Sequence, residues 1–233
     1  MTVSSEVRTE FRGFTPAALH FFEQLAQHQE RAWFEAHRQQ YQDEVRAPLA
    51  ALVEALAPEL RRLRLPLLAD AQRALFRIHR DVRFSHDKRP YKTHAGAALS
   101  RSGEKMDPGM LYVHIDPLGC FMASGFYRPP PDALRRLRSA LVARPDALRR
   151  SLAALARAGY ALEPDQDALQ RVPRGFEGIE SEDLRTLLRW KSFIVRRPIG
   201  DEELYSAELP RVIAQFLGDT APWLRFGWDS LDA

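Results

Sequence analysis

Residues 110–127 read MLYVHIDPLGCFMASGFY, and this stretch decides the fold class. Two runs of apolar and β-forming residues enclose Asp116-Pro117-Leu118-Gly119, in which Asp, Pro and Gly occupy the positions favoured in a type I turn. We therefore expect an antiparallel hairpin with strands near residues 110–116 and 119–127. Gly125, inside the second strand, indicates a bulge or a close approach of another backbone segment.

Shorter stretches before and after the hairpin add further strands to the predicted sheet. They lie near residues 74–84, 95–100 and 191–197. In the first stretch apolar residues recur at every second position, as in a half-buried strand, and Arg80 falls on the same face. A guanidinium on an apolar face needs a carboxylate or a cavity beside it, because an unpaired buried charge is costly.

Helical spacing of apolar residues dominates both ends of the chain. In residues 14–65 they recur three and four positions apart, and Thr15-Pro16 fits a helix start. Pro58 is expected to kink or split the last helix of this part. Residues 132–233 are also mostly helical, and Pro210 is expected to divide the C-terminal helix.

This order of elements predicts an α+β fold, in which an antiparallel sheet is flanked by N-terminal and C-terminal helices. We expect a flexible N-terminus at residues 1–13 and a single domain over residues 14–233. Within that domain, residues 74–128 would hold the sheet and a basic loop.

The composition is that of a globular protein, with 233 residues, 45% hydrophobic and 28% charged. The formal charge is +3, but residues 77–94 alone carry +4, so the rest of the chain is slightly acidic. A nucleic-acid binder would instead spread its positive charge over a whole face. A lone cysteine, Cys120, and the lack of a signal sequence or an apolar run of membrane-spanning length predict a cytoplasmic protein outside the membrane.

Common catalytic motifs are missing. His79-Arg80-Asp81 resembles the HRD triplet of protein kinases, but residue 86 is His where kinases place a metal-binding Asn. The sequence has no phosphate-binding loop, dinucleotide fingerprint, nucleophile elbow or HExxH motif. The spacing of its histidines and aspartates matches no known metal site, so we predict no metal, and no motif identifies a cofactor. The residues in question are His79, His86, His94 and His114, with Asp81 and Asp87.

Residues 76–94, FRIHRDVRFSHDKRPYKTH, are the best candidate for a functional site. Arginines suit bidentate contacts with a phosphate or carboxylate, and lysines supply point charges. The predicted anion-binding residues are Arg77, Arg80, Arg83, Lys88, Lys92 and Arg128. Asp81 and Asp87 are candidates for acid/base or orienting roles, and Ser85, Tyr91 and Tyr127 for supporting ones.

Three hypotheses remain open for this basic segment. The first is a site for a phosphorylated or carboxylated small molecule, with or without catalysis. The second is a nucleic-acid or protein binding module that uses the basic loop, with aromatic residues such as Phe84 stacking on bases. The third is a structural network of ion pairs, with the functional site elsewhere. Nothing in the sequence indicates the oligomeric state.

The basic segment also resembles the bacterial and fungal domain-of-unknown-function family 2461. The resemblance rests on Arg77-Ile78, Arg80-Asp81, Arg83-Phe84-Ser85, Asp87-Lys88 and Pro90-Tyr91-Lys92. Further blocks are Phe11–Phe14, Trp33-Phe34, Tyr41, Pro48, Tyr112–Pro117, Gly125–Pro129 and Pro173–Phe176. His28-Gln29 departs from the asparagine pair expected there. Because the family name assigns no activity, the resemblance implies a shared fold and site location, but no chemistry.

Overall fold

A computed structural model describes residues 10–83 and 86–233 of the chain. In these residues an antiparallel sheet of four strands forms the centre, in the order β1-β2-β3-β4. The strands are β1 Ala95–Leu99, β2 Met110–Ile115, β3 Phe121–Phe126 and β4 Phe193–Pro198. Helices precede and follow the sheet, so the predicted α+β fold is confirmed.

The β2–β3 hairpin forms at the predicted turn. The Gly119 amide donates to the Asp116 carbonyl at 3.0 Å, and the Leu118 amide donates to the Asp116 carboxylate at 2.8 Å. In β3, Gly125 has a φ of 135°, and a Cβ at this position would lie 2.2 Å from the Phe193 carbonyl of β4. The close backbone approach expected at Gly125 is therefore present, and it is the neighbouring strand that requires glycine.

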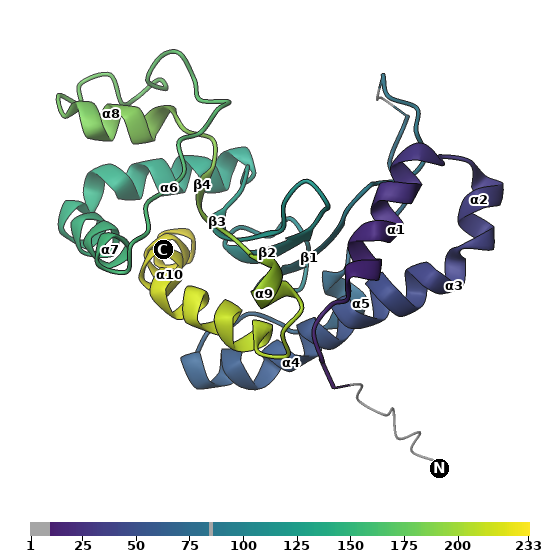
Figure 1. The fold of residues 1–233 in the computed structure, drawn as a ribbon. Helices are drawn as coiled ribbons and strands as arrows, with labels where there is room; N and C mark the ends of the chain where they lie inside the picture. The colour runs from purple at the N-terminus through teal and green to yellow at the C-terminus, as the bar shows by residue number, and fades with distance from the viewer. Residues whose placement is uncertain (1–9, 84–85) are drawn as a thin grey trace, which may run out of the picture.

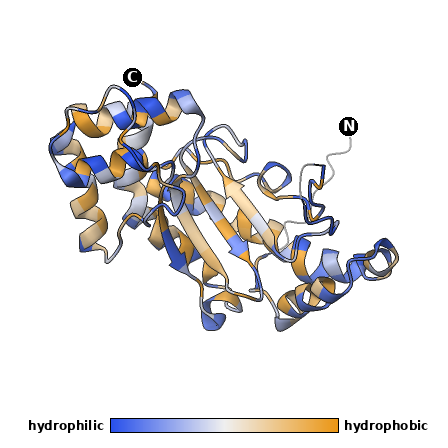
Figure 2. Cartoon of the chain, turned by 90° about the horizontal axis from the view of Figure 1, so that it is seen from above, coloured by the Kyte–Doolittle hydropathy of each residue, from blue (hydrophilic) through white to orange (hydrophobic). Residues whose placement is uncertain are grey.

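Two long helices pack against one face of the sheet. Helix α10 (Leu209–Leu231) lies against β3 and α4 (Ala47–Leu63) against β1, beneath the sheet in Figure 1. The alternate β2 residues Leu111, Val113 and Ile115 are almost completely buried on this face. Seen from above, the strands lie between helices on either side (Figure 2). The face of the sheet opposite α4 and α10 lines a pocket.

The N-terminal part is helical, as predicted. Its elements are α1 Pro16–Gln27, α2 Arg31–Ala36, α3 Arg38–Gln40 and a π-helical turn, η1 Tyr41–Arg46, which runs into α4. The Thr15 hydroxyl precedes α1 but donates to Glu44 at 2.7 Å instead of capping the helix. Pro58 lies inside α4 without splitting it.

The C-terminal part contains α6 Pro131–Ala143, α7 Pro145–Arg157, α8 Glu182–Arg189 and α9 Asp201–Leu204, followed by α10. The predicted division near Pro210 is confirmed, because α9 ends at Leu204 and α10 begins at Leu209. Trp223 and Trp228 of α10 are buried in the core cluster. Within the described ranges, no helix has the length and apolar character needed to cross a bilayer.

The strand predicted near residues 74–84 does not form as expected. Ala71–Ala74 form the short helix α5, and the residues that follow make only isolated bridges, Leu75 with Ala97 and His79 with Tyr91. Up to residue 83, the even-numbered residues are still the more buried ones, so the alternation was real. The ladder ends because the chain changes partners. Phe76 donates to the Gly96 carbonyl of β1 at 2.9 Å, but Arg80 donates to the Pro90 carbonyl at 2.8 Å.

Candidate functional site

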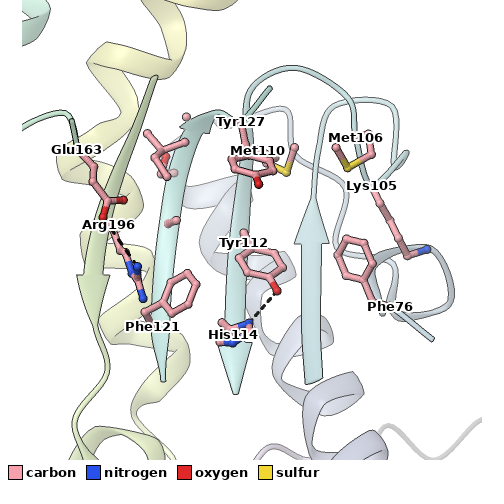
Figure 3. A pocket seen from close by; sticks show the side chains of 14 residues that line it. Phe76, Lys105, Met106, Met110, Tyr112, His114, Phe121, Tyr127, Glu163 and Arg196 are labelled. Atoms are coloured by element: carbon pink, nitrogen blue, oxygen red, sulfur yellow. Dashed lines mark hydrogen bonds and ion pairs between the residues drawn. The ribbon is translucent and has the colours of Figure 1, made fainter. Parts of the chain in front are cut away.

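A pocket of about 460 Å³ lies on the open face of the sheet (Figure 3). Because strand side chains alternate, the residues of β2 that do not face the helices, including Tyr112 and His114, point into it. Strand residues that line it are Met110, Tyr112, His114, Phe121, Ala123, Ser124, Gly125, Ile194 and Arg196. Loop residues Phe76, Lys105, Met106, Tyr127 and Glu163 complete the lining. The lining is largely apolar and aromatic, with cations on two sides.

Arg196 supplies the cation on the β4 side of the pocket. Its guanidinium lies 3.7 Å from the centre of the Phe121 ring, which is close enough for a cation–π contact. Glu163 approaches the same guanidinium at 3.8 Å from the loop before α8. These two contacts hold Arg196 over the sheet, as Figure 3 shows.

Two lysines supply positive charge on the opposite side. The ammonium groups of Lys92 and Lys105 lie 5.2 and 5.8 Å from the centre of the Phe76 ring. Burial lowers the pKa of Lys92, and the nearby charges of Arg77 and Lys105 lower it further. In the described part of the chain, neither ammonium has a carboxylate within 4.0 Å. Like charges thus gather here, and none of the described carboxylates pairs with them.

A hydrogen-bonded chain of three side chains runs along β2 and into the turn that follows it; Figure 3 shows its first two members, Tyr112 and His114, at the lower end of the pocket. The Tyr112 hydroxyl lies 2.9 Å from His114 Nδ1, and His114 Nε2 lies 3.3 Å from Asp116 Oδ2. The three residues are two positions apart, so a strand presents them on one face. Gly96 of β1 leaves the space that the tyrosine occupies, because a Cβ there would lie 2.7 Å from its hydroxyl oxygen.

His94, just before β1, joins this group from the neighbouring strand. Its Nδ1 lies 3.9 Å from Asp116 Oδ2, and its ring centre lies 4.5 Å from that of His114. Burial lowers the pKa of His94 to about 4, and burial also lowers the pKa of His114. Both imidazoles are therefore neutral near pH 7, the form that relays a proton or binds a metal ion. Burial raises the pKa of Tyr112 to about 12, which keeps the phenol protonated.

The sequence profile of a conserved hypothetical protein family, DUF2461, matches residues 17–226, nearly the whole chain. The chain belongs to this family. No curated protein and no solved structure gives a significant match. The family description names no activity, so the chemistry of this DUF2461 protein must be argued from its own residues.

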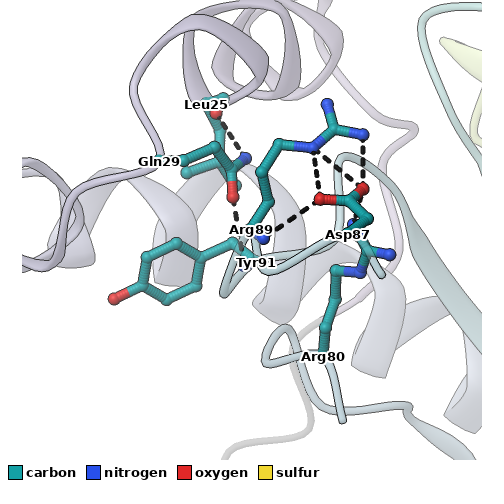
Figure 4. Close-up of polar contacts among 6 residues, drawn as sticks. All are labelled: Leu25, Gln29, Arg80, Asp87, Arg89 and Tyr91. Atoms are coloured by element: carbon teal, nitrogen blue, oxygen red, sulfur yellow. Dashed lines mark hydrogen bonds and ion pairs between the residues drawn. The ribbon is translucent and has the colours of Figure 1, made fainter. Parts of the chain in front are cut away.

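The predicted basic segment forms ion pairs within itself. Asp87 accepts from Arg80 at 2.5 Å and from Arg89 at 2.6 Å (Figure 4). These arginines, Arg89 foremost, hold the pKa of Asp87 well below its usual range. Arg80 is thus paired with a carboxylate, as its place on an apolar face required.

A second ion pair joins two residues that are two positions apart in the sequence. Arg83 binds Asp81 with two hydrogen bonds of 2.9 and 2.7 Å, and it holds the pKa of that carboxyl well below its usual range. The Lys88 ammonium donates to the Val82 carbonyl at 3.0 Å. Ser85 and Phe84 lie outside the described residues.

Tyr91, one of the predicted supporting residues, lies in the core and not in the pocket. Tyr91 is buried and stacks on Phe34, with ring centres 4.5 Å apart, so it belongs to the core. Its amide donates to the Gln29 side chain at 3.1 Å, and Gln29 in turn donates to the Leu25 carbonyl at 2.7 Å (Figure 4). Gln29, which stands where the resemblance led us to expect asparagine, therefore links the end of α1 to the basic segment.

The other predicted residues lie around the pocket and beyond it. Tyr127 lines the pocket, and it alone does so among the predicted site residues that the structure describes. Arg128, which follows it, forms an ion pair with Asp167. Arg77 lines a separate hollow of about 250 Å³ with Arg38 and Arg46. The sequence thus pointed to the neighbourhood of the pocket but missed most of its lining.

The missed residues had a recognisable signal. Tyr112, His114 and Asp116 repeat at strand spacing in a segment predicted as a strand, and polar residues on one strand face indicate an exposed or ligand-facing side. The partners Arg196 and Lys105 come from distant parts of the chain, and spacing alone does not bring them together.

Proposed function

We propose that the protein binds a small molecule that joins a phosphate or carboxylate to a flat apolar group, in the pocket on the open face of the sheet. The observation that carries this proposal is the pair of ammonium groups, Lys92 and Lys105, beside the Phe76 ring. The charge of Lys105 already acts on Lys92, and an anion bound at Lys105 would offset that repulsion and accept charge-assisted hydrogen bonds.

The rest of the pocket suits the apolar part of such a ligand. Tyr112 offers an aromatic ring for stacking, and Met110 offers an adaptable apolar surface. Phe121, which already packs against Arg196 and His114, adds a fixed apolar wall. Arg196 stands at the far side, where it would contact a second polar group of the ligand. A mostly apolar cavity with a few fixed polar groups is the usual form of a small-molecule site.

The predicted site residues divide in this proposal. Lys105 lines the pocket and would contact the anion directly, while Lys92 and Arg77 lie outside the lining and add positive charge nearby. We assign Asp81 and Asp87 orienting roles, because their lowered pKa values keep them ionised and make them weak bases. Their arginine partners would then shape the loop beside the pocket, which combines the first and third hypotheses from the sequence.

Isothermal titration calorimetry with phenyl phosphate, inorganic phosphate and phenol tests the proposal. We expect phenyl phosphate to bind most tightly, since only this probe has both the anion and the ring. Lys105→Gln should weaken its binding by about 10- to 100-fold, the equivalent of one hydrogen bond to a charged group. Lys88→Gln is the matched control, because its ammonium already bonds to the Val82 carbonyl.

Two results would contradict this assignment. Equal weakening by Lys88→Gln and Lys105→Gln would place the anion at the basic loop. If a short single-stranded oligonucleotide bound and phenyl phosphate did not, the second hypothesis, nucleic-acid binding, would be favoured instead.

A further inference from the structure

Three metal-binding side chains meet at the end of β2. We propose that His94, His114 and Asp116 bind a divalent transition-metal ion at the edge of the pocket. One candidate donor atom from each residue lies within 4.8 Å of the other two. This proposal does not rest on the proposed ligand, because all three donors belong to the protein.

The register of the sheet brings the three donors together. Ala95 pairs with Ile115 and Gly96 pairs with His114, so His94 and Asp116 stand opposite each other one step beyond the last pair. On a pleated sheet, residues two apart share a face, and all three side chains therefore lie on the pocket side. His114 lies within β2, and His94 and Asp116 directly adjoin the hydrogen-bonded ends of β1 and β2, which limits their movement.

The distances are close to those of a coordinated ion. Asp116 Oδ2 lies 3.3 Å from His114 Nε2 and 3.9 Å from His94 Nδ1. Donors about 2.0–2.2 Å from a tetrahedral ion are separated by roughly 3.3–3.6 Å. His94 is one-third exposed, so its side chain has room to move toward the other two donors when an ion binds.

Further hydrogen bonds orient two of the three ligands. The Leu118 amide donates to Asp116 Oδ1 at 2.8 Å, which leaves Oδ2 facing the histidines. The Tyr112 hydroxyl lies 2.9 Å from His114 Nδ1, the nitrogen turned away from Asp116. Metal-binding histidines commonly have such a partner on the second nitrogen, because it fixes the tautomer and the ring plane.

The donor set indicates the class of ion. Two imidazoles and one carboxylate suit Zn²⁺ or Fe²⁺ and leave coordination positions open for water or a substrate. Since His114 lines the pocket, an ion bound to it would lie at the edge of the cavity. An ion there would polarise an oxygen of a molecule in the pocket, a role that the lysines and Arg196 do not supply.

Titration of the EDTA-treated 233-residue chain with ZnCl₂, followed by calorimetry, tests the site without any organic ligand. We expect one Zn²⁺ per chain. His94→Gln and Asp116→Asn should each weaken binding by more than the roughly 10- to 100-fold that loss of an outer hydrogen-bond partner costs. His20→Gln is the matched control, because His20 also lies 3.2 Å from a carboxylate, that of Glu23, but is exposed on α1.

The variants are chosen so that folding does not obscure the result. The amide oxygen in Asp116→Asn can still accept from Leu118, and equal near-ultraviolet circular dichroism of all variants in EDTA checks the fold. Failure of Zn²⁺ to bind the wild-type protein, or unchanged affinity in both ligand variants, would overturn the proposal. Lys105→Gln should leave Zn²⁺ binding intact, so this site and the anion site can fail separately.

Discussion

In the basic segment the arginines meet carboxylates a few positions away along the chain, whereas the cations that line the pocket, Lys105 and Arg196, come from distant elements. Arg83 pairs with Asp81, and Arg80 and Arg89 pair with Asp87. Lys92 and Lys105 gather beside Phe76 without such partners in the described residues. A run of basic residues in a sequence is therefore not by itself a binding site. Arginines that pair with nearby aspartates have less charge left for a ligand.

The two regions also differ in what holds them in place. The basic segment depends on local side-chain contacts, while the pocket depends on the fit of neighbouring strands. A backbone change in the sheet should therefore have a much larger effect than a side-chain change in the basic segment.

The largest effect is expected for Gly125→Ala. A Cβ at this position would lie 2.2 Å from the Phe193 carbonyl, and the φ of 135° is strained for alanine. We expect the free energy of unfolding to fall by about 3 kcal/mol or more, because β3 and β4 must separate. Urea denaturation measures the loss.

Gly175→Ala is the control for strain alone. Gly175 has a φ of 92°, but no atom beyond its chain neighbours lies within 4 Å of the place that an alanine Cβ would take. Its cost should be about 1–2 kcal/mol. Equal losses of unfolding free energy at the two glycines would show that the close approach of β4 to Gly125 adds nothing to the cost of backbone strain.

A smaller effect is expected for Gly96→Ala, which addresses the chain of side chains along β2. The new methyl would push the Tyr112 hydroxyl away from His114, and the tyrosine ring can move with little cost to folding. Zn²⁺ affinity should then fall by about 10- to 100-fold, as in Tyr112→Phe. Calorimetric titration measures it.

A double-mutant cycle sharpens this prediction. If both changes act through the same hydrogen bond, Gly96→Ala should add little once Tyr112→Phe is present. Fully additive losses would mean that the methyl disturbs the site by another route.

A pH-dependent and smaller effect is expected for Asp87→Asn in the basic segment. Hydrogen bonds from Arg89 and Arg80 keep the pKa of Asp87 below its usual range in the folded protein. The resulting stability is present above the unfolded-state pKa, near pH 4, and is lost as the pH falls toward the folded-state value. The variant should therefore be less stable than wild type at pH 7 and approach it below about pH 4.

Thermal unfolding from pH 7 to pH 2 follows the difference between the two proteins. A gap that stays constant down to pH 2 would rule out this carboxylate as its source. Asp146→Asn is a suitable control, because Asp146 pairs with a single exposed arginine, Arg149, on α7.

The sequence was sufficient for elements that local rules determine. The hairpin turn, the helical ends and the division near Pro210 depend on a few neighbouring residues, and all were predicted. The prediction of a strand near residues 74–84 was wrong. The alternation of burial continues beyond Phe76, but from Ile78 the backbone hydrogen bonds are made with residues 90–92 and no longer with β1. Period alone does not identify the hydrogen-bonding partner.

Most of the pocket lining escaped prediction for a related reason. Its cations, Lys105 and Arg196, are isolated in the sequence, and only the strand order and the loop before β2 bring them to one surface. The histidines were noticed, but Asp116 was interpreted only as a turn residue. In the structure its two carboxylate oxygens divide these roles, Oδ1 in the turn and Oδ2 toward His114.

The smallest effect is expected for Arg83→Gln, the most direct test of the comparison. Its side chain is 76% exposed and its ion pair with Asp81 is local, so solvent and salt screen it. We expect phenyl phosphate affinity and stability to remain at wild-type values, whereas Arg196→Gln should weaken the ligand by losing the cation held over Phe121. Calorimetric titration of both variants with phenyl phosphate shows which of the two regions binds the ligand. The reverse result, weaker binding only in Arg83→Gln, would mean that the local ion pairs open for the ligand and that the basic segment itself is the site.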